Sequence, residues 1–294
     1  MQGQVSMDQK RRIAVTVVVS TKNEELAIGQ CLKGLQDFQQ VIVVDSNSID
    51  ATQEIARKSP GVEVVNFTWS GTYPKKKQWC LENLSFLSDW VLFVDADEGV
   101  SPELLKELRS RAWAAEGHVA FDVQLDYEIF GKRLKHGHRV VKRALMKVDG
   151  SVTFPRLPDL GIPGMGELEG HYQPLCRGSV GRLEGRLWHR DPDPFTSWLH
   201  RHNKYSDWEA GIAERPELSQ AVRELRSRQG RLFQGVPLKP VVFFVFFFII
   251  KRGFLDGRPG LDYALALSFY YWQIDVKRRE LRREGRVRPS ENAG

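Results

Sequence analysis

The sequence predicts an α/β fold in which a mostly parallel sheet carries helices on both faces. Four short apolar runs recur in the first hundred residues, each typical of a strand that is buried on both faces. Helical patterns with short connections lie between the runs, and repeated strand–helix units of this kind build parallel sheets. With 294 residues, the chain is also long enough to bury a substantial core.

The first two strand–helix units have the clearest signals. Residues 13–20 (IAVTVVVS) are continuously apolar, and positions 28, 31, 32 and 35 then place apolar residues on one face of a helix. Residues 41–45 (VIVVD) form the second predicted strand. Asp50 has Gln53 three residues later, a capping-box pattern that predicts the start of the second helix.

The next two units complete this half of the chain. Residues 62–67 (VEVVNF) predict the third strand, residues 75–87 a basic helix, and residues 90–94 (WVLFV) the fourth strand. Ser101 and Pro102 then open a helix at its cap and first-turn positions. We therefore expect a nucleotide-binding type of architecture.

Three acids, Asp95, Asp97 and Glu98, follow the fourth strand directly. Ligands of open α/β sheets bind at the carboxyl ends of the strands, and carboxylates at alternate positions there can share a hard divalent cation. The alternative is a solvated acidic turn before a helix. The polar residues that follow the other strands or lie in the basic helix are Ser20, Thr21, Lys22, Asn23, Asp45, Ser46, Asn47, Lys75, Lys76 and Lys77. This edge supplies what a nucleoside diphosphate needs: polar groups, positive charge and ligands for a bridging metal.

The composition disfavours several classes of protein. The net charge of +6 indicates an anionic partner, but the chain has no DNA-binding signature, Walker-type loop or GxGxxG after a strand. We therefore expect no nucleic-acid partner. The three cysteines are scattered, which indicates neither a disulfide framework nor a zinc site. The beginning MQGQVSMDQKRRIAV lacks an apolar signal core, so we expect the protein in the cytoplasm or on the inner face of the cytoplasmic membrane.

Three segments resemble the family 2 inverting glycosyltransferases, whose GT-A fold binds nucleotide sugars at such strand ends. They are VVVSTKNEELAIGQCLKGL, VIVVDSNSIDATQEIA and DWVLFVDADEGVSPEL. The ending GFLDGRPGLDYALALSFYYWQIDVKRREL is similar to the tail of the bacterial branch that includes lipopolysaccharide core β-1,4-glucosyltransferases. The resemblance is strong over residues 13–110 and 253–282 and patchy between them.

The resemblance implies roles for residues at the sheet edge. Asp95 and Asp97 would be the DxD pair that holds Mg²⁺ or Mn²⁺, with Asp97 the better candidate for direct coordination. Asp45 would contact the base, uracil if the donor is a UDP-sugar, and Thr21 and Glu24 would line the nucleoside pocket. Lys76 or Lys77 would approach the diphosphate or the sugar. A turn-forming role for Asp45 and simple solvation of the lysines are the alternatives.

Inversion at an anomeric carbon requires a base on the face opposite the leaving diphosphate. By resemblance this is a carboxylate from the second half, and GMGELEGHYQP, within a Gly/Pro-rich tract, offers Glu167 and Glu169. We favour Glu169, which precedes a glycine and His171. The sequence departs from the family's His-Glu order, so Glu167, Glu169 and Asp159 stay open. His171 and His189 are candidate contacts of the acceptor or diphosphate, or structural histidines.

The last third of the chain has a different character. Residues 241–250 are ten apolar residues, too few to cross a bilayer alone, and predict either a buried helix or a segment resting at a membrane interface. The basic run of residues 277–288 reads as a solvated helix face or a contact for anionic lipid. The expected organisation is a flexible 1–12, a nucleotide-sugar-binding half 13–119, an acceptor and catalytic half 120–190, and a helical membrane-associating region 191–294.

The sequence thus predicts a metal-dependent inverting glycosyltransferase. It would move a hexose from a nucleotide sugar, with a UDP-sugar favoured, to a hydroxyl of a lipid-linked or cell-envelope glycan at the membrane surface. Transfer to a polyprenyl phosphate is the second enzymatic hypothesis, and a non-catalytic nucleotide-sugar-binding scaffold at the membrane is the hypothesis from another class.

Overall fold

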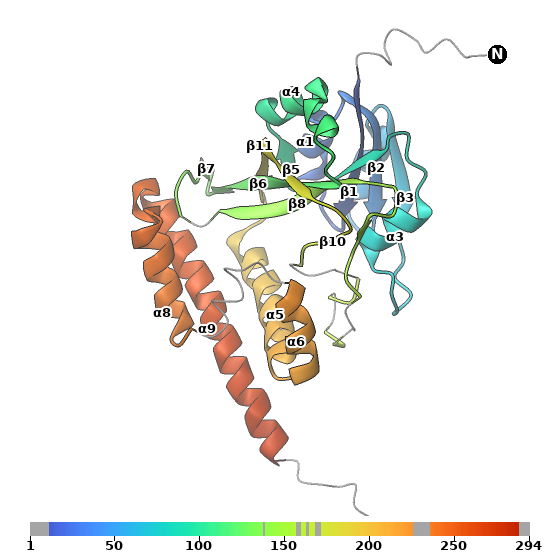
Figure 1. Ribbon diagram of the computed structural model, residues 1–294. Helices are drawn as coiled ribbons and strands as arrows, with labels where there is room; N and C mark the ends of the chain where they lie inside the picture. The colour runs from blue at the N-terminus through green and yellow to red at the C-terminus, as the bar shows by residue number, and fades with distance from the viewer. Residues whose placement is uncertain are drawn as a thin grey trace, which may run out of the picture. The chain divides into compact units, whose positions relative to one another are not determined.

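The computed structural model describes residues 12–137, 139–156, 160–162, 165–167, 172–225 and 236–287. They fall into two compact units. The first comprises the described parts of Met1–Arg133, Arg139–Arg156 and Gln173–Pro192, and the second those of Leu134–His138, Leu157–Tyr172 and Asp193–Gly294. The first unit contains the strands, and the long helices belong to the second (Figure 1).

The described strands are β1 (Ile13–Thr21), β2 (Phe38–Asp45), β3 (Val62–Asn66), β4 (Trp90–Asp95), β5 (Glu98–Val100), β6 (Ala120–Ile129), β7 (Lys132–Arg133), β8 (Val140–Lys147), β9 (Val152–Thr153), β10 (Leu175–Cys176) and β11 (Val180–Arg190). The helices of the first unit are α1 (Ile28–Lys33), α2 (Thr52–Lys58), α3 (Lys76–Asn83), α4 (Pro102–Ser110) and the 3₁₀ helix η2 (Ala112–Glu116).

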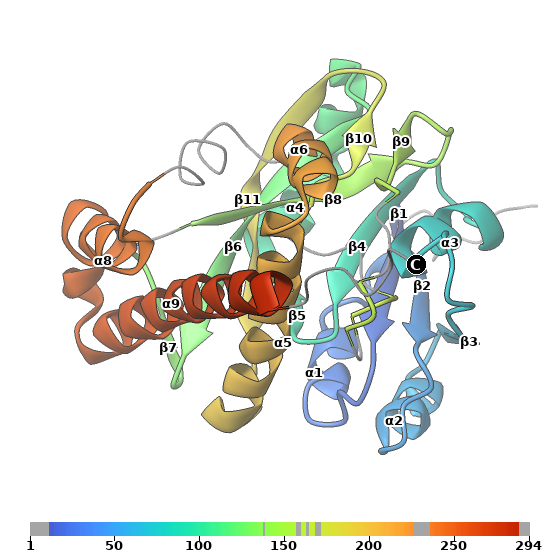
Figure 2. The same ribbon diagram turned by 90° about the horizontal axis from the view of Figure 1, so that it is seen from below.

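The main sheet has the order β3-β2-β1-β4-β8-β6-β11-β5, with β7 paired to β6 (Figure 2). The four strands predicted from the apolar runs are parallel to one another. Beyond them the sheet is mixed, because β8 runs antiparallel to both β4 and β6 while β6 and β11 are parallel. The predicted α/β fold with a helix-flanked sheet and a helical C-terminal region is confirmed.

Both faces of the parallel half are buried, as the apolar runs predict. Side chains alternate between the faces of a strand. Val17 and Val19 of β1 therefore pack on one face with α1, α2 and α4, and Val18 packs on the other with Cys80 of α3. All four of these side chains are fully buried. The continuous apolar strand β1 thus holds helices on both sides.

The helix starts follow the sequence signals with one difference. Ser101 accepts a hydrogen bond from the Leu104 N–H at 3.2 Å and Pro102 opens α4, as predicted. At α2, Asp50 accepts from the Thr52 N–H at 3.0 Å, but the Gln53 amide donates to Asp45 at 2.6 Å. The reciprocal capping box is therefore not formed, because the buried Asp45 carboxylate takes the Gln53 donor.

The second unit is helical. Its described helices are α5 (Phe195–Ala213), α6 (Pro216–Leu225), α8 (Lys239–Phe244), the π-helix η3 (Val245–Ile250), the 3₁₀ helix η4 (Gly253–Asp256) and α9 (Arg258–Val287). Among the described residues, no helix is both long and apolar enough to cross a membrane.

Part of the basic run in α9 binds α5 and the residue that follows it. Lys277 pairs with Asp207 and donates to the Asn203 carbonyl at 2.7 Å. Arg278 and Arg282 both donate to Glu214, at 2.8 and 2.7 Å. These cations hold α9 against α5, so neither solvation nor lipid binding accounts for them.

Glu214→Gln is expected to lower the free energy of unfolding by about 1 kcal/mol at neutral pH, the size of a partly exposed ion pair. Hydrogen bonds from Arg282 and then Arg278 hold the pKa of Glu214 below its ordinary value. A depressed pKa stabilises the fold above the unfolded-state pKa, about 4.3, and this contribution disappears as the pH falls through the folded-state pKa. Urea melts should therefore separate the variant from wild type at pH 7 and converge in acid, while Glu280→Gln on exposed α9 surface should follow wild type throughout.

Candidate active site

The carboxyl ends of the parallel strands bring the predicted polar residues to one edge of the sheet. The register pairs Thr21 with Asp45 across β1 and β2, and Ser20 with Asp95 across β1 and β4. Helix α3, which carries the lysines, packs on one face of the same strands. The sequence prediction that these side chains converge is met by the fold of the first unit.

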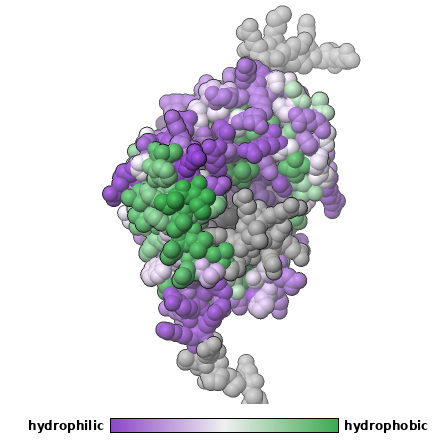
Figure 3. All heavy atoms as spheres, turned by 60° about the vertical axis from the view of Figure 1, so that its left-hand side comes forward, coloured by the Kyte–Doolittle hydropathy of each residue, from purple (hydrophilic) through white to green (hydrophobic). Residues whose placement is uncertain are grey.

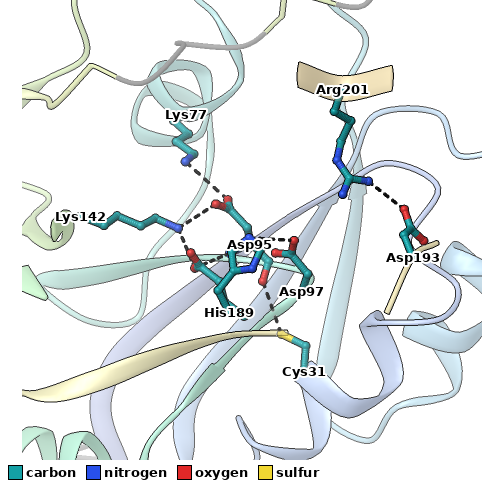
Figure 4. Close-up of polar contacts among 9 residues, drawn as sticks. Cys31, Lys77, Asp95, Asp97, Lys142, His189, Asp193 and Arg201 are labelled. Carbon is teal, nitrogen blue, oxygen red and sulfur yellow. Dashed lines mark hydrogen bonds and ion pairs between the residues drawn. The ribbon is translucent and has the colours of Figure 1, made fainter. Parts of the chain in front are cut away.

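Asp95 is held by two lysines. The Lys142 ammonium lies 2.8 Å from one Asp95 oxygen and 2.7 Å from Glu98, and the Lys77 ammonium lies 3.5 Å from the other Asp95 oxygen (Figure 4). Glu98 also accepts a hydrogen bond from the Asp95 N–H at 2.9 Å. The Glu98 side chain is 1% exposed and the Asp95 side chain is 41% exposed. The network therefore joins one buried carboxylate to one that a ligand can reach.

The lysines shift the pKa values of the three acids to different extents. Burial alone would raise the pKa of Asp95, but the ammonium groups of Lys142 and Lys77 bring it well below its usual range. Burial raises the pKa of Glu98, and Lys142 only partly offsets this. Burial would lower the pKa of Lys142, yet Asp95 and Glu98 raise it, so Lys142 stays charged. The positive charges of Lys142 and Lys77 thus keep Asp95 ionised despite its partial burial.

Asp97 has less compensation. Burial raises the pKa of Asp97, His189 offsets part of this rise, and the charges of Asp95 and Asp191 add to it. The His189 Nε2 atom lies 3.3 Å from an Asp97 oxygen (Figure 4). The imidazole also stacks on the Tyr127 ring, with 4.6 Å between the ring centroids. Asp97 is the acid of this edge that an added cation would stabilise.

Three buried hydroxyl oxygens lie at the ends of β1 and β2. Within the described part of the chain, the side-chain oxygens of Ser20, Thr21 and Ser46 have no hydrogen-bond partner. Such groups are rare in folded proteins because each costs the desolvation of a polar atom. Their position beside the acids suits a polar ligand.

Asp45 builds the loop that follows β2. Its buried carboxylate accepts from the Ser48 N–H at 2.8 Å and from the Gln53 amide at 2.6 Å. The turn-forming role considered for Asp45 is therefore real, and a contact with a base stays a prediction. Glu24, also on this edge, donates its N–H to the Thr52 hydroxyl at 2.7 Å.

The lysines of α3 are not solvated. Lys76 is 5% exposed, and its ammonium lies 3.4 Å from the Thr21 carbonyl. The Lys77 side chain is 22% exposed and points toward Asp95 (Figure 4). Both cations are directed at the strand ends, which is where a diphosphate would need them.

The candidate bases belong to the second unit. Glu167 is buried there, beside Met165, which packs with Trp208 and Ile212. Glu169, His171 and Asp159 lie outside the described residues. The choice among the carboxylates therefore stays open.

Two residues that pair around Asp95 were not predicted as site residues from the sequence. Lys142 was not among the predicted residues, and Glu98 was noted only as the third acid of the motif. The register of β4 with β8 pairs Leu92 with Leu145, and continuing it brings Lys142 level with Asp95. The sequence carried little signal, because β8 contains Arg143 and Lys147 as well as Lys142, and the partner of Lys142 depends on a pairing between distant segments.

Comparison with known proteins identifies the family. Residues 16–163, half of the chain, match the family model for glycosyl transferase family 2. The chain belongs to glycosyl transferase family 2. The family predicted from the strand-end motifs is therefore confirmed.

Relatives of this family 2 member include curated proteins and solved structures. An uncharacterised glycosyltransferase of Rickettsia typhi is 38% identical over 95 residues, which is 32% of this chain and 31% of that protein, so the match spans about a third of such relatives. The lipopolysaccharide core biosynthesis glycosyltransferase LpsC of Rhizobium meliloti is 22% identical over 89% of this chain and 93% of its own. The mannosyltransferase PcManGT of Pyrobaculum calidifontis, solved with GDP-Man and Mn²⁺, has a TM-score of 0.48 at 16% identity and covers 93% of this chain and 89% of its own.

The acids of this family 2 member suit a hard divalent cation. Asp95 and Asp97 offer oxygen ligands, and the pKa of Asp97, which burial raises and His189 only partly offsets, means that added positive charge would stabilise its carboxylate. The described residues contain no group of three or more His, Cys, Asp or Glu that could hold a metal by itself. Mg²⁺ is commonly bound in proteins by one or two carboxylates together with phosphates of the substrate.

Proposed function

We propose that this protein is a metal-dependent inverting glycosyltransferase. It transfers a hexose from a nucleotide sugar, with a UDP-sugar favoured, to a hydroxyl of a lipid-linked or cell-envelope glycan. The observation that carries the proposal is the strand-end edge where Asp97, whose pKa is raised by burial, follows Asp95 by two residues, and Asp95 is held in ion pairs by Lys142 and Lys77.

Each group at this edge has a role in binding the donor. Asp97, with Asp95, would hold Mg²⁺ or Mn²⁺, which neutralises the charge that develops on the leaving diphosphate. Lys76 and Lys77 would add positive charge beside the phosphates. Thr21, Glu24 and Asp45 would line the nucleoside pocket, and His189 would orient the diphosphate or the acceptor through its contact with Asp97.

The acceptor hydroxyl must lose a proton as it attacks. We assign this step to a carboxylate of the second unit, with Glu169 favoured over Glu167 and Asp159, and give His171 the task of orienting the acceptor. A base within hydrogen-bond reach of the hydroxyl is required by in-line attack from the face opposite the leaving group.

We also propose that the acceptor is presented at the inner face of the cytoplasmic membrane, with the protein bound peripherally. One support is LpsC, a relative that matches over most of both chains and is named for lipopolysaccharide core biosynthesis. The other is the apolar segment of residues 241–250.

A thermal-shift screen tests the donor half of the proposal. UDP, GDP, CMP and their sugars are added with Mn²⁺, Mg²⁺ or EDTA, followed by assay of nucleotide release with glycan acceptors. We expect one nucleotide to raise the melting temperature only with metal. Absence of any shift would overturn the donor site. A shift with no transfer to any glycan or lipid acceptor would favour the scaffold, and full activity of Glu169→Gln on a polyprenyl phosphate would favour that acceptor.

Thr21→Val is expected to weaken donor binding by about tenfold, the value of one hydrogen bond to a ligand. Because the buried Thr21 hydroxyl has no partner in the described structure, its loss should leave the melting temperature of the free protein unchanged. Calorimetric titration with the nucleotide that shifts wild type measures the affinity. Thr16→Val in the same strand is the control, since its hydroxyl already donates to Gln40 at 2.8 Å and should affect stability without affecting donor affinity.

A further inference from the structure

Residues 241–250, within the helical segment formed by α8 and η3, present apolar side chains on every side. Phe243 and Phe247 point inward and are 6% and 0% exposed. The outward residues, with their exposed fractions, are Val241 59%, Val242 39%, Val245 43%, Phe246 38%, Ile249 52% and Ile250 64%. A helix apolar all round is normally buried in a large core or a membrane. This one is buried on one side only.

The inner side is sufficient to fix the segment. The Phe243 ring lies 4.8 Å from the Tyr271 ring and the Phe247 ring 5.4 Å from the Tyr263 ring, both on α9. Phe247 also occupies a niche made by two glycines: a Cβ at Gly137 would lie 2.4 Å from its ring, and one at Gly253 would lie 3.0 Å away. The outward side chains are therefore not needed to hold α8 and η3 in place.

Neighbouring elements extend the outward apolar surface. Phe254 and Leu255 of η4 are 46% and 52% exposed, and Leu265, Phe269 and Trp272 of α9 are 44–50% exposed at i, i+4 and i+7. Figure 3, which turns the side carrying α8 toward the reader, shows hydrophobic residues gathered in one area. We call the exposed residues of α8, η3, η4 and this part of α9 the apolar face. Surfaces of this kind mark interaction sites, since single exposed apolar residues are common but large groups are not.

The charges beside the apolar face are predominantly positive. Lys251 and Arg252 follow η3 directly and are exposed, with the Lys251 ammonium 5.3 Å from the Phe246 ring centroid. Asp256, the acid of η4, is 3% exposed and is used internally, accepting from the N–H groups of Lys135 and His136. The Arg258 guanidinium pairs with Asp262 at 2.9 Å. Outward-facing positive charge beside exposed apolar side chains is complementary to anionic lipid.

We propose that the apolar face docks the protein on an anionic bilayer surface, with Val241, Ile249, Ile250, Phe269 and Trp272 entering the boundary between headgroups and acyl chains. The segment cannot span, because ten apolar residues are about half the length that a bilayer core needs. Three basic residues of the later run in α9 are paired with Asp207 and Glu214, whereas Lys251 and Arg252 lie directly beside the apolar face, so we assign the basic part of the contact to these two. This proposal names the surface by which the protein would reach a membrane-bound acceptor. It rests on the proposed function only in taking the acceptor to lie at a membrane.

Vesicle flotation of the full chain tests the docking surface. Wild type is mixed with neutral phosphatidylcholine vesicles or with vesicles that contain phosphatidylglycerol. Ile249→Ser/Ile250→Ser should lower binding to both by roughly tenfold or more, because it removes apolar area that would enter the bilayer. Lys251→Gln/Arg252→Gln should lower binding to the anionic vesicles by roughly tenfold and leave the neutral ones unchanged. Leu87→Ser, at a 65% exposed position of the first unit, is the matched control and should bind like wild type.

The proposal is overturned if wild type stays with the unbound fraction for both vesicles, or if the isoleucine variant floats as wild type does. A wild-type dimer in light scattering that the isoleucine variant lacks would assign the apolar face to a second copy of this chain instead. The melting-temperature shift by the nucleotide is measured on the same preparations without lipid. Loss of flotation with that shift retained rejects the membrane surface alone, and loss of the shift with flotation retained rejects the donor site alone.

Discussion

Replacing Asp97 with asparagine is expected to abolish the metal-dependent thermal shift by nucleotide and to lower glycosyl transfer by more than about 100-fold, because it would remove the proposed ligand of the catalytic cation. The amide keeps the shape of the side chain but removes the charge. Burial raises the pKa of Asp97, and the charges of Asp95 and Asp191 add to this rise, so removal of the Asp97 charge should leave the free protein at least as stable as wild type.

This pairing of lost binding with retained stability is what separates a metal ligand from a structural acid. Differential scanning calorimetry with EDTA measures stability, and titration with Mn²⁺ and nucleotide measures binding. Asp37→Asn is the control, because Asp37 is a surface acid that pairs with Arg109 at 2.6 Å. If Asp97→Asn bound nucleotide and Mn²⁺ as tightly as wild type, the acids that end β4 would be an ordinary turn.

Lys142→Met should lower the free energy of unfolding by about 3–5 kcal/mol, the cost of leaving one partner of a buried ion pair without its counter-charge. The carboxylate left behind is Glu98, whose side chain is 1% exposed. Lys142→Met/Glu98→Gln should recover most of this loss, because neither charge then remains buried. Lys106→Met, at an exposed lysine of α4, should have no measurable effect.

The loss should also depend on pH in a defined direction. Burial already raises the pKa of Glu98, and removal of Lys142 raises it further. A raised pKa means that the folded state binds more protons than the unfolded state, so the free energy of unfolding falls as pH rises through that window. The deficit of Lys142→Met relative to wild type should therefore be larger at about pH 8 than at about pH 5. Equal deficits at both values in urea melts with EDTA would show that Glu98 is not the group left unpaired.

The parallel half of the sheet was predictable because its signals are local. In each of β1, β2 and β4 an apolar run leads to polar residues at the carboxyl end of the strand, so the edge carrying Thr21, Asp45 and Asp95 follows from the chain order and the parallel topology. The mixed half of the sheet was harder to predict from the sequence. The position of β8 between β4 and β6 is set by pairing over long sequence separations, and Lys142 enters the site only through that pairing.

Competition between side chains accounts for the remaining differences. Gln53 lies at the sequence spacing that would complete a capping box with Asp50, but its amide donates to Asp45. Asp45 is buried, so leaving its carboxylate without this donor would cost more free energy. Arg278 and Arg282 resemble a solvated basic face in sequence, yet both reach Glu214. A local pattern lists the possible partners of such side chains, and the tertiary structure decides among them.

The residues that surround Phe247 also fix a short segment of the chain inside the second unit. Leu134–Gly137 belongs to the second unit, where the Gly137 N–H donates to the Lys251 carbonyl at 2.9 Å and Asp256 holds the two preceding N–H groups. The chain returns to the first unit at Arg139, three residues before Lys142. Lys142, which pairs with Asp95, therefore lies a few residues along the chain from a segment whose backbone is fixed inside the second unit.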